Sequence, residues 1–359
     1  MKIRSVTSRV EDFALTRPYA IAGQAPLADV PNVLVRIEAE GGAFGLGAGS
    51  PGEHVTGETI EGAAAALAPP NLQWLAGRDV RALPALCREA VGRFPLTPAA
   101  RAAVDIALHD LLSKSLGVPL VEMLGRAHDA LPTSITIGIK GVAETLSEAE
   151  EYLGRGFRVL KVKIGDALDV DLERIAKLRE GPARAAVVRV DANVGYDLPE
   201  TARFFERAAP YGIEFVEQPV PREDFAGIRT LPESWRARIA ADESLHDEKD
   251  ALALAEPPDD PACGIFNIKL MKCGGVRSAL RIATIAETAG VALMWGCMDE
   301  SRISIAAALH AAFASPATRY LDLDGSLDLA RDVVSGGFIL ENGVMRTTGA
   351  PGLGVKEIS

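Results

Sequence analysis

Short apolar segments alternate with longer amphipathic segments along the chain from about Leu131 onward. Amphipathic patterns typical of helices cover residues 170–179, 275–289 and 301–314, and the apolar segments are residues 134–139, 158–163, 186–191, 213–217, 239–242, 265–269, 292–297 and 319–322. Strands that alternate with helices pair in parallel, and eight of them can close a barrel. The pattern therefore predicts an α/β fold built on a (β/α)-barrel.

A polar residue ends each of seven successive predicted strands. The intervals between these residues are 28, 26, 25, 27, 28 and 25 positions, and the residues are Lys163, Asp191, Glu217, Asp242, Lys269, Cys297 and Asp322. A nearly constant step is expected when each strand–helix unit occupies one position around a barrel. Because the carboxyl ends of the strands share one rim, where barrel enzymes carry their active sites, we expect these side chains to gather there.

The chain before the predicted barrel has a mixed pattern. Residues 2–10 and 32–38 are strand-like, and residues 97–116 form a strong helical pattern that Gly117 ends. Residues 45–52, GLGAGSPG, lack the G-x-G-x-x-G spacing of a dinucleotide site, so we expect a turn in which the backbone approaches another element closely. His109, among apolar neighbours in the predicted helix, is interpreted as a packed surface or interface residue.

The change of pattern predicts two domains. The tail from Asp328 onward contains another strand-like segment, GGFILENG, and we expect it to return to the first domain. We predict an α+β capping domain at residues 1–127, completed by residues 326–359, and a barrel at residues 128–325.

Composition argues against several classes of protein. Hydrophobic residues make up 48% of the 359, which is ample for a large core, and a net charge of −11 without a basic run argues against a nucleic-acid partner. The N-terminus lacks the apolar region of a signal peptide, and no apolar run approaches the roughly 18 residues of a membrane span. The cysteines show no CxxC spacing and are typical of reduced thiols: Cys87, Cys263, Cys273 and Cys297. We expect a cytoplasmic protein that binds neither nucleic acid nor membranes.

Three carboxylates end consecutive predicted strands: Asp191 in RVDANVGY, Glu217 in EFVEQP and Asp242 in AADES. Any one of them alone is explained as a solvated strand end or a helix cap. Three on one rim would repel one another strongly unless a cation lay among them. Oxygen ligands without a nearby His or Cys favour a hard ion such as Mg²⁺ over zinc. We therefore interpret the three as metal ligands.

Lysines end the strands on both sides of these carboxylates. Lys161 and Lys163, in KVK, differ by two and so face the same side of one strand, and Lys269, in NIKLMK, ends the strand beyond the acids. A lysine at a strand end often extends to solvent or pairs with an acid, but a pair facing the barrel interior is hard to explain in that way. Ammonium groups near a divalent cation raise each other's cost of protonation, so one lysine could act as a base near neutral pH.

Lys163 and Lys269 would place a base at each face of one substrate carbon. A metal that holds a substrate carboxylate would stabilise the enediolate left when the neighbouring α-proton departs. A lysine at each face then permits inversion of that carbon. The expected chemistry is proton abstraction next to a carboxylate.

These motifs together resemble the enolase superfamily, and within it the muconate-lactonizing subgroup. The resemblance covers essentially the whole chain and rests on residues 161–163, 191–193, 217–219 and 242–244 and on NIKLMKCGG at 267–275. It implies a modified (β/α)7β barrel with an α+β N-terminal capping domain, one Mg²⁺ per subunit and a homo-oligomer.

The resemblance also implies roles for the singled-out residues. The metal ligands would be Asp191, Glu217 and Asp242, and the acid/base pair would be Lys163 and Lys269. Lys161 would orient the substrate carboxylate and tune its neighbour.

The end of the eighth predicted strand separates the activities of this subgroup. In YLDLDG, Asp322 and Asp324 are two apart and face the same way, into the mouth of the barrel. The pair resembles that of dipeptide epimerases, in which the acids bind the free α-ammonium of the substrate, and two carboxylates not needed for a metal suit that task. The plainer explanation is that one acid caps the loop or pairs with Arg302. By the same resemblance, Thr136 contributes a hydroxyl or backbone contact to the dipeptide.

Two positions in the sequence bear on which side chain the second residue of the dipeptide carries. In epimerases of alanyl-glutamate, a loop of the capping domain carries an Arg for the glutamate; here that loop reads YAIAGQAPL, with Gln24 where the Arg is expected. Asp299, in CMDES, adds an acid after the seventh strand, and Trp295 and Met298 are expected to pack at the rim and line a side-chain pocket. We expect a dipeptide epimerase for second side chains that are hydrophobic or cationic rather than acidic.

Two other hypotheses stay open at this point. A cycloisomerase, an o-succinylbenzoate synthase or an N-acylamino-acid racemase of the same subgroup would share the lysines and the metal site, and the D-x-D separates them. A metal-binding barrel without catalysis would have lost a lysine or a ligand, and none is lost here. Acid-sugar dehydratases of the superfamily use a His dyad near the seventh strand, and WGCMDE contains no His.

Overall fold

Eight parallel strands form one curled sheet in the computed structural model, which describes residues 1–19 and 27–358. The strands lie in chain order around the sheet: β5 (Ile135–Ile137), β6 (Val159–Lys163), β7 (Val187–Asp191), β8 (Val216–Glu217), β9 (Ile239–Ala241), β10 (Ile265–Ile268), β11 (Ala292–Trp295) and β12 (Thr318–Leu321). The first and last strands meet, because the Ser134 amide donates to the Leu321 carbonyl at 3.0 Å and Thr133 forms a parallel bridge with Leu321. All eight predicted strands are present, and the barrel is confirmed.

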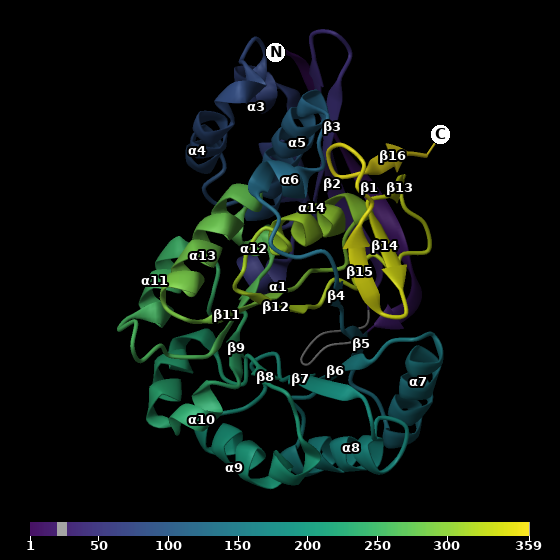
Figure 1. The fold of residues 1–359 in the computed structure, drawn as a ribbon, viewed down its shortest axis with the longest axis vertical. Helices are drawn as coiled ribbons and strands as arrows, with labels where there is room; N and C mark the ends of the chain where they lie inside the picture. Colours follow the sequence, from purple (N-terminus) through teal and green to yellow (C-terminus); the bar gives the residue numbers. More distant parts are fainter. Residues whose placement is uncertain (20–26, 359) are drawn as a thin grey trace.

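Helices connect successive strands and cover the outside of the sheet (Figure 1). They are α7 (Val142–Gly154), α8 (Leu168–Glu180), α9 (Leu198–Ala208), α10 (Glu233–Arg236), α11 (Glu248–Ala255), α12 (Leu270–Cys273), α13 (Val276–Thr288) and α14 (Arg302–Ala312), with 3-10 segments η3 (Ala209–Tyr211) and η4 (Arg222–Thr230). Local signals start several of them: the Asp197 side chain accepts from the Glu200 amide at 2.7 Å and begins α9. No helix separates β12 from the strands of the tail within the described chain, so the barrel is of the (β/α)7β type.

Side chains alternate between the barrel interior and the helical layer. Phe215, Ala240, Ile265 and Met294 form a small apolar cluster inside the barrel. Trp295, next to Met294, belongs instead to the large core between strands and helices, where its Nε1 donates to Thr318 Oγ1 at 2.9 Å. The expectation that Trp295 lines a pocket at the rim is wrong, because strand alternation places it on the outer face of β11.

The N-terminal part of the chain forms a second unit above the barrel in Figure 1. Its antiparallel sheet has the order β1 (Ile3–Tyr19), β2 (Leu27–Ala39), β3 (Phe44–Gly49). The helices are α1 (Glu53–Thr56), α2 (Ile60–Ala66), α3 (Pro69–Leu72), α4 (Leu83–Arg93), α5 (Pro98–Leu116) and α6 (Leu120–Leu124), with 3-10 turns η1 (Gln73–Leu75) and η2 (Val80–Ala82). The long helix α5 packs on β2 and β3 and also contacts α12 and α13 of the barrel.

The glycine-rich segment is a strand rather than the turn expected from the sequence. Gly45, Gly47 and Gly49 lie on one face of β3, directly against α5. A Cβ at Gly47 would lie 1.8 Å from the Ala103 carbonyl oxygen, and one at Gly45 would lie 2.1 Å from that of Ala107. The alternate glycines therefore let strand and helix backbones approach, so the close approach is present although the local conformation was wrongly predicted.

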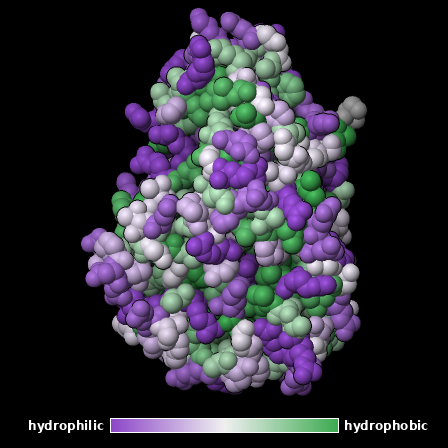
Figure 2. Space-filling view, in the orientation of Figure 1, coloured by the Kyte–Doolittle hydropathy of each residue, from purple (hydrophilic) through white to green (hydrophobic). Residues whose placement is uncertain are grey.

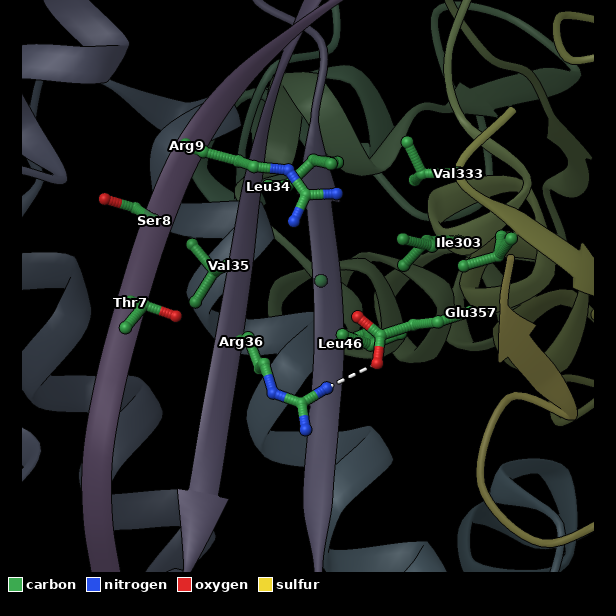
Figure 3. A pocket seen from close by; sticks show the side chains of 12 residues that line it. Thr7, Ser8, Arg9, Leu34, Val35, Arg36, Leu46, Ile303, Val333 and Glu357 are labelled. Carbon is green, nitrogen blue, oxygen red and sulfur yellow. Dashed lines mark hydrogen bonds and ion pairs between the residues drawn. The ribbon is translucent and has the colours of Figure 1, made fainter. Parts of the chain in front are cut away.

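The tail adds short strands beside the sheet formed by β1, β2 and β3 (Figure 1). β13 (Val334–Gly336) pairs with β16 (Val355–Glu357), and β14 (Phe338–Glu341) pairs with β15 (Val344–Thr347), which in turn pairs with β4 (Leu131–Pro132). A cavity of about 200 Å³ lies where the tail meets β1 and β2, and an ion pair of 2.5 Å between Arg36 Nη1 and Glu357 Oε2 crosses it (Figure 3). The Leu353 amide also donates to Asp110 Oδ1 on α5 at 2.8 Å, so the tail is tied to the N-terminal unit.

Hydrophilic and hydrophobic side chains intermingle on the face of the molecule shown in Figure 2. Among the helices formed by residues 1–19 and 27–358, none has the length and apolar character that crossing a bilayer requires.

Candidate active site

The three predicted metal-ligand carboxylates lie side by side at one rim of the barrel. Asp191 ends β7 and is in register with Glu217, which ends β8, and Asp242 directly follows β9. All three are fully buried. Their positions follow from strand alternation, which turns the last side chain of each of these strands inward.

The predicted lysines surround these carboxylates. Lys161 Nζ lies 3.0 Å from Asp191 Oδ2, 2.8 Å from Glu217 Oε2 and 2.7 Å from Asp322 Oδ2. On the β6 side, Lys163 Nζ is 2.7 Å from Asp191 Oδ2. On the β10 side, Lys269 Nζ is 2.7 Å from Asp242 Oδ2. Lys163 and Lys269 therefore approach the acid cluster from different strands on its two sides.

The electrostatics of the lysines differ from the expected neutral base. Burial favours the neutral form of Lys161, but Asp322, Glu217 and Asp191 raise its pKa well above the usual value. Burial likewise favours neutral Lys269, and Asp242 and Glu217 raise its pKa. The reason is the negative charge of the carboxylates, which a divalent cation among them would offset.

The residues present fit a magnesium ion. Burial, and next the neighbouring Asp191, raise the pKa of Glu217 to about 8, so a cation among these carboxylates would be needed to favour the ionised form of Glu217 at neutral pH. Burial and Asp242 raise the pKa of Glu243 to about 7, and among the described residues the buried Glu243 Oε2 has no hydrogen-bond partner. The donors are carboxylate oxygens, and a hard cation prefers such ligands.

Several residues that support this cluster were not singled out from the sequence. Asn267 Nδ2 donates to Glu217 Oε1 at 2.7 Å, and Asn193 Oδ1 accepts from Lys163 Nζ at 2.7 Å. Lys272 is buried, pairs with Asp242 Oδ1 and donates to the Asp242 carbonyl oxygen at 2.5 Å. Asn267 precedes Lys269 by two, so the period of the strand would have found it. Lys272 follows the strand on a helical turn, where that period no longer applies.

The end of β12 brings the two acids of the D-x-D motif to the same mouth. Asp322 Oδ1 accepts from Ser134 Oγ at 2.5 Å, while its Oδ2 pairs with Lys161. Asp324 Oδ2 accepts from the Thr136 amide at 2.7 Å. Burial and the neighbouring Asp322 raise the pKa of Asp324 to about 7. The Thr136 amide is thus used to hold Asp324.

A cavity of about 620 Å³ opens above these side chains, between the barrel rim and the N-terminal unit. Lys161, Lys163 and Lys269 line it, and the three strand-end carboxylates are buried behind them. The other predicted substrate-binding residues in its lining are Thr136, Met298, Asp299, Asp322 and Asp324. Gln24 lies outside the described residues.

The lining of this cavity is acidic outside the lysines. From the N-terminal unit it includes Asp29, Glu53 and Glu61, from the barrel Asp299, and from the start of the tail Asp328. No arginine occurs in the described lining. Acidic side chains in such number attract cationic groups to this part of the cavity.

Comparisons with known proteins agree with this geometry. Residues 4–125 match the mandelate racemase / muconate lactonizing enzyme N-terminal domain, and residues 144–357 match the enolase C-terminal domain-like family. The chain is 61% identical to the L-Lys-D/L-Arg epimerase of Methylococcus capsulatus, over 99% of both chains, and 36% identical to a hydrophobic dipeptide epimerase of Enterococcus faecalis, over 99% of this chain and 100% of that one. The solved structure of a dipeptide epimerase from Methylococcus capsulatus, in complex with Mg and L-Arg-D-Lys, superposes with a TM-score of 0.96 at 61% identity and 99% coverage of both chains.

Proposed function

Because this chain belongs to the enolase superfamily, we propose that it is a magnesium-dependent dipeptide epimerase that inverts the α-carbon of the second residue of an L,L-dipeptide. The observation that carries the proposal is the convergence of three lysines and the Asp322–Asp324 pair on one cavity, with three buried carboxylates paired to these lysines. The relatives described above act on, or are crystallised with, dipeptides, which supports the same reaction class.

The two flanking lysines exchange the proton. The Nζ of Lys163 or Lys269 removes the α-proton from one face of the substrate carbon, and the other lysine returns a proton to the opposite face, by a 1,1-proton transfer through an enediolate. Lys161, which contacts acids on three strands, keeps its charge and orients the substrate carboxylate. Asp191, Glu217 and Asp242 would hold one Mg²⁺, which when bound stabilises the negative charge that develops on that carboxylate.

The free α-ammonium of the first residue would bind Asp322 and Asp324. Both acids line the cavity and are nearly fully buried, so an ammonium group placed between them is shielded from water. A substrate with a neutral acyl group there would leave the Asp324 carboxylate without a cation. This disfavours the N-acylamino-acid racemase, o-succinylbenzoate synthase and cycloisomerase alternatives.

The second side chain is proposed to be cationic. Asp299, whose pKa burial raises to about 6, lines the cavity together with Asp29, Glu53 and Asp328. A lysine or arginine side chain would bring a positive charge that complements these acids. The name of the Methylococcus relative, an L-Lys-D/L-Arg epimerase, supports the same choice.

Mass spectrometry in D₂O tests the proposal. The protein with Mg²⁺ is incubated with L-Lys-L-Arg, L-Leu-L-Tyr, L-Ala-L-Glu and N-succinyl-L-Lys, and incorporation of deuterium at the α-carbon is followed. We expect the cationic dipeptide to label fastest. Labelling of N-succinyl-lysine alone would replace the epimerase with the racemase, and no labelling of any compound would favour a catalytically silent barrel.

A substitution at Asp299 separates side-chain recognition from chemistry. Asp299→Asn is expected to reduce kcat/KM for L-Lys-L-Arg by about tenfold, the loss of one charge-assisted contact, while kcat/KM for L-Leu-L-Tyr stays within about twofold. Equal losses of kcat/KM for both dipeptides would show that Asp299 does not recognise the side chain of the second residue.

Three wider expectations accompany this function. We propose that residues 1–127 with 326–359 cap the barrel of residues 128–325 and close its mouth over the substrate. The cytoplasmic location and the homo-oligomer stay predictions, which cell fractionation and light scattering would check.

A further inference from the structure

The turn that follows Lys269 is held from behind by helix α5 of the N-terminal unit. Lys269 directly follows β10 and precedes the one-turn helix α12, and Gly274 and Gly275 lead into α13. The Lys269 carbonyl accepts from the Lys272 amide at 3.0 Å and the Cys273 amide at 3.2 Å, so the backbone of Lys269 is fixed to this turn. Any element that positions the turn therefore positions the lysine.

Asp105 of α5 caps helix α13, which begins where this turn ends. Helix α13 begins after Gly275, which has no side chain to cap it. Asp105 Oδ1, from 171 positions away, accepts from the Val276 amide at 2.7 Å. A carboxylate at a helix N-terminus satisfies a free amide and interacts favourably with the helix dipole.

The two glycines make room for this contact. Gly275 has φ +115°, and a Cβ there would lie 2.5 Å from the Asp105 Cβ. A Cβ at Gly274, where φ is +78°, would overlap the Arg101 guanidinium. Arg101 Nη2 in turn donates to the Cys273 carbonyl at 3.0 Å. Two side chains one turn apart on α5 thus hold the α12–α13 junction.

Asp105 is itself held in place by buried neighbours. His109 Nδ1 lies 3.1 Å from Asp105 Oδ1 on the same helix. Cys87, from α4, lies near both, and the ligand atoms of Cys87, Asp105 and His109 are all within 4.8 Å of one another. His109 is therefore buried and packed beside Asp105, where α5 meets α13, and does not lie on the surface. The grouping has the spacing of a metal site, but Asp105 Oδ1 already accepts from an amide of α13, which fits a supported helix cap.

We propose that Asp105 is a positioning residue for Lys269: by capping α13 from the N-terminal unit, it holds the Lys269–Gly275 turn so that this lysine meets one face of the substrate carbon. The proposal rests on the proposed function. It makes the two lysines unequal, because none of the hydrogen bonds described for α5 reaches β6, which carries Lys163. Loss of Asp105 then weakens proton transfer at one face only.

Deuterium exchange measured separately on the two epimers, L-Lys-L-Arg and L-Lys-D-Arg, reads out each face. Lys269→Ala identifies the epimer whose α-proton Lys269 removes, since that epimer loses exchange while the other still exchanges through Lys163. Asp105→Ala is expected to slow exchange of that same epimer by about tenfold or more relative to the other, because a displacement of about 1 Å costs up to a hundredfold in rate. Asp105→Asn retains an acceptor oxygen and is expected to restore the ratio of the wild-type protein.

Asp197→Ala is the matched control. It removes the side-chain cap of α9 in the same barrel, where Asp197 accepts from the Glu200 amide at 2.7 Å, without touching the turn after Lys269. Its exchange ratio is expected to equal that of the wild-type protein. Arg101→Met, which removes the contact to Cys273, provides a second route if Asp105→Ala does not fold, and is expected to shift the ratio in the same direction.

The outcomes separate the two proposals. Asp105→Ala is decisive if it folds, and Arg101→Met is decisive if it does not. If that variant slows α-proton exchange of both epimers equally, as a loss of overall stability would, the positioning role is wrong while the epimerase stands. If the wild-type protein labels neither epimer, the proposed function fails, and the positioning role fails with it.

Discussion

At the scale of the single residue, the site is governed by a balance of charge between lysines and carboxylates. Lys161 contacts Asp191, Glu217 and Asp322, and each lysine that lines the cavity is paired with at least one acid. Without a further cation the acids beside Lys161 and Lys269 raise the pKa values of these two lysines and favour their protonated forms. The chemistry therefore depends on metal and substrate entering the cluster together.

Removal of either flanking lysine is expected to separate inversion from exchange. In Lys163→Ala or Lys269→Ala, epimerisation should fall by at least about a hundredfold, because one face of the carbon loses its acid or base. Each variant should still exchange the α-proton of one epimer, and the two variants should differ in which epimer it is. Chiral chromatography of the products with deuterium counting checks this, and loss of all exchange in both variants would contradict a base at each face.

At the scale of the element, the contact of β3 with α5 depends on missing side chains. Gly47→Ala would place a Cβ 1.8 Å from the Ala103 carbonyl and force the two elements apart. We expect a loss of about 1–3 kcal/mol in the free energy of unfolding, as in other overpacked cores. Gly92→Ala, in helix α4 of the same unit, meets nothing within 4 Å and is expected to be neutral or stabilising by up to about 1 kcal/mol. Urea unfolding of both variants decides the matter, and equal effects would refute the packing argument.

The contact of helix α14 with helix α6 depends on a neutral histidine. His310 of α14 accepts from the Val121 amide at 2.9 Å, and burial lowers the pKa of His310 to about 4, below the usual 6.5. Between these two values the unfolded chain binds a proton at His310 that the folded protein does not, so the contribution of His310 to the free energy of unfolding falls as the pH falls from about 6.5 to 4. With each pKa unit worth about 1.4 kcal/mol, the total is on the order of 3 kcal/mol.

Urea midpoints at pH 7, 6 and 5 measure this effect. Burial also lowers the pKa of His246 to about 4 and raises the pKa values of buried carboxyl groups such as Glu217 and Asp324, so the wild-type slope contains all of these groups. His310→Gln should therefore lose less stability between pH 7 and pH 5 than the wild-type protein does, and an unchanged slope would show that His310 does not contribute.

At the scale of the whole molecule, the buried acids link metal binding to stability. Asp191, Glu217 and Asp242 come from three consecutive strands, so an ion bound among them joins the folded barrel and finds no such site in the unfolded chain. At a hundredfold excess over Kd, Mg²⁺ is expected to add about 3 kcal/mol and to raise the melting temperature by several degrees.

Thermal unfolding with and without Mg²⁺ checks this linkage. EDTA should reverse the shift and abolish turnover. In Asp191→Asn, Mg²⁺ should raise the melting temperature above that of the metal-free variant by much less than in the wild-type protein. A rise equal to that of the wild-type protein would place the ion elsewhere.

The sequence by itself determined the barrel and the composition of its rim. Strand alternation turns every second side chain inward, and a step of 25–28 residues brings one strand end to each position, so Lys163, Asp191, Glu217 and Asp242 could be grouped without coordinates. The same rule would have found Asn267. These features are local and periodic, and such features are readable from one chain.

Only the tertiary structure decided which distant segments meet. The cap that Asp105 places on α13 joins residues 171 positions apart, and the glycines of β3 have meaning only beside α5. The pKa values of the lysines depend on distances between side chains of separate strands. Contacts of this kind arise from how two units dock, and docking is set by the complementarity of whole surfaces, which has no period along the chain.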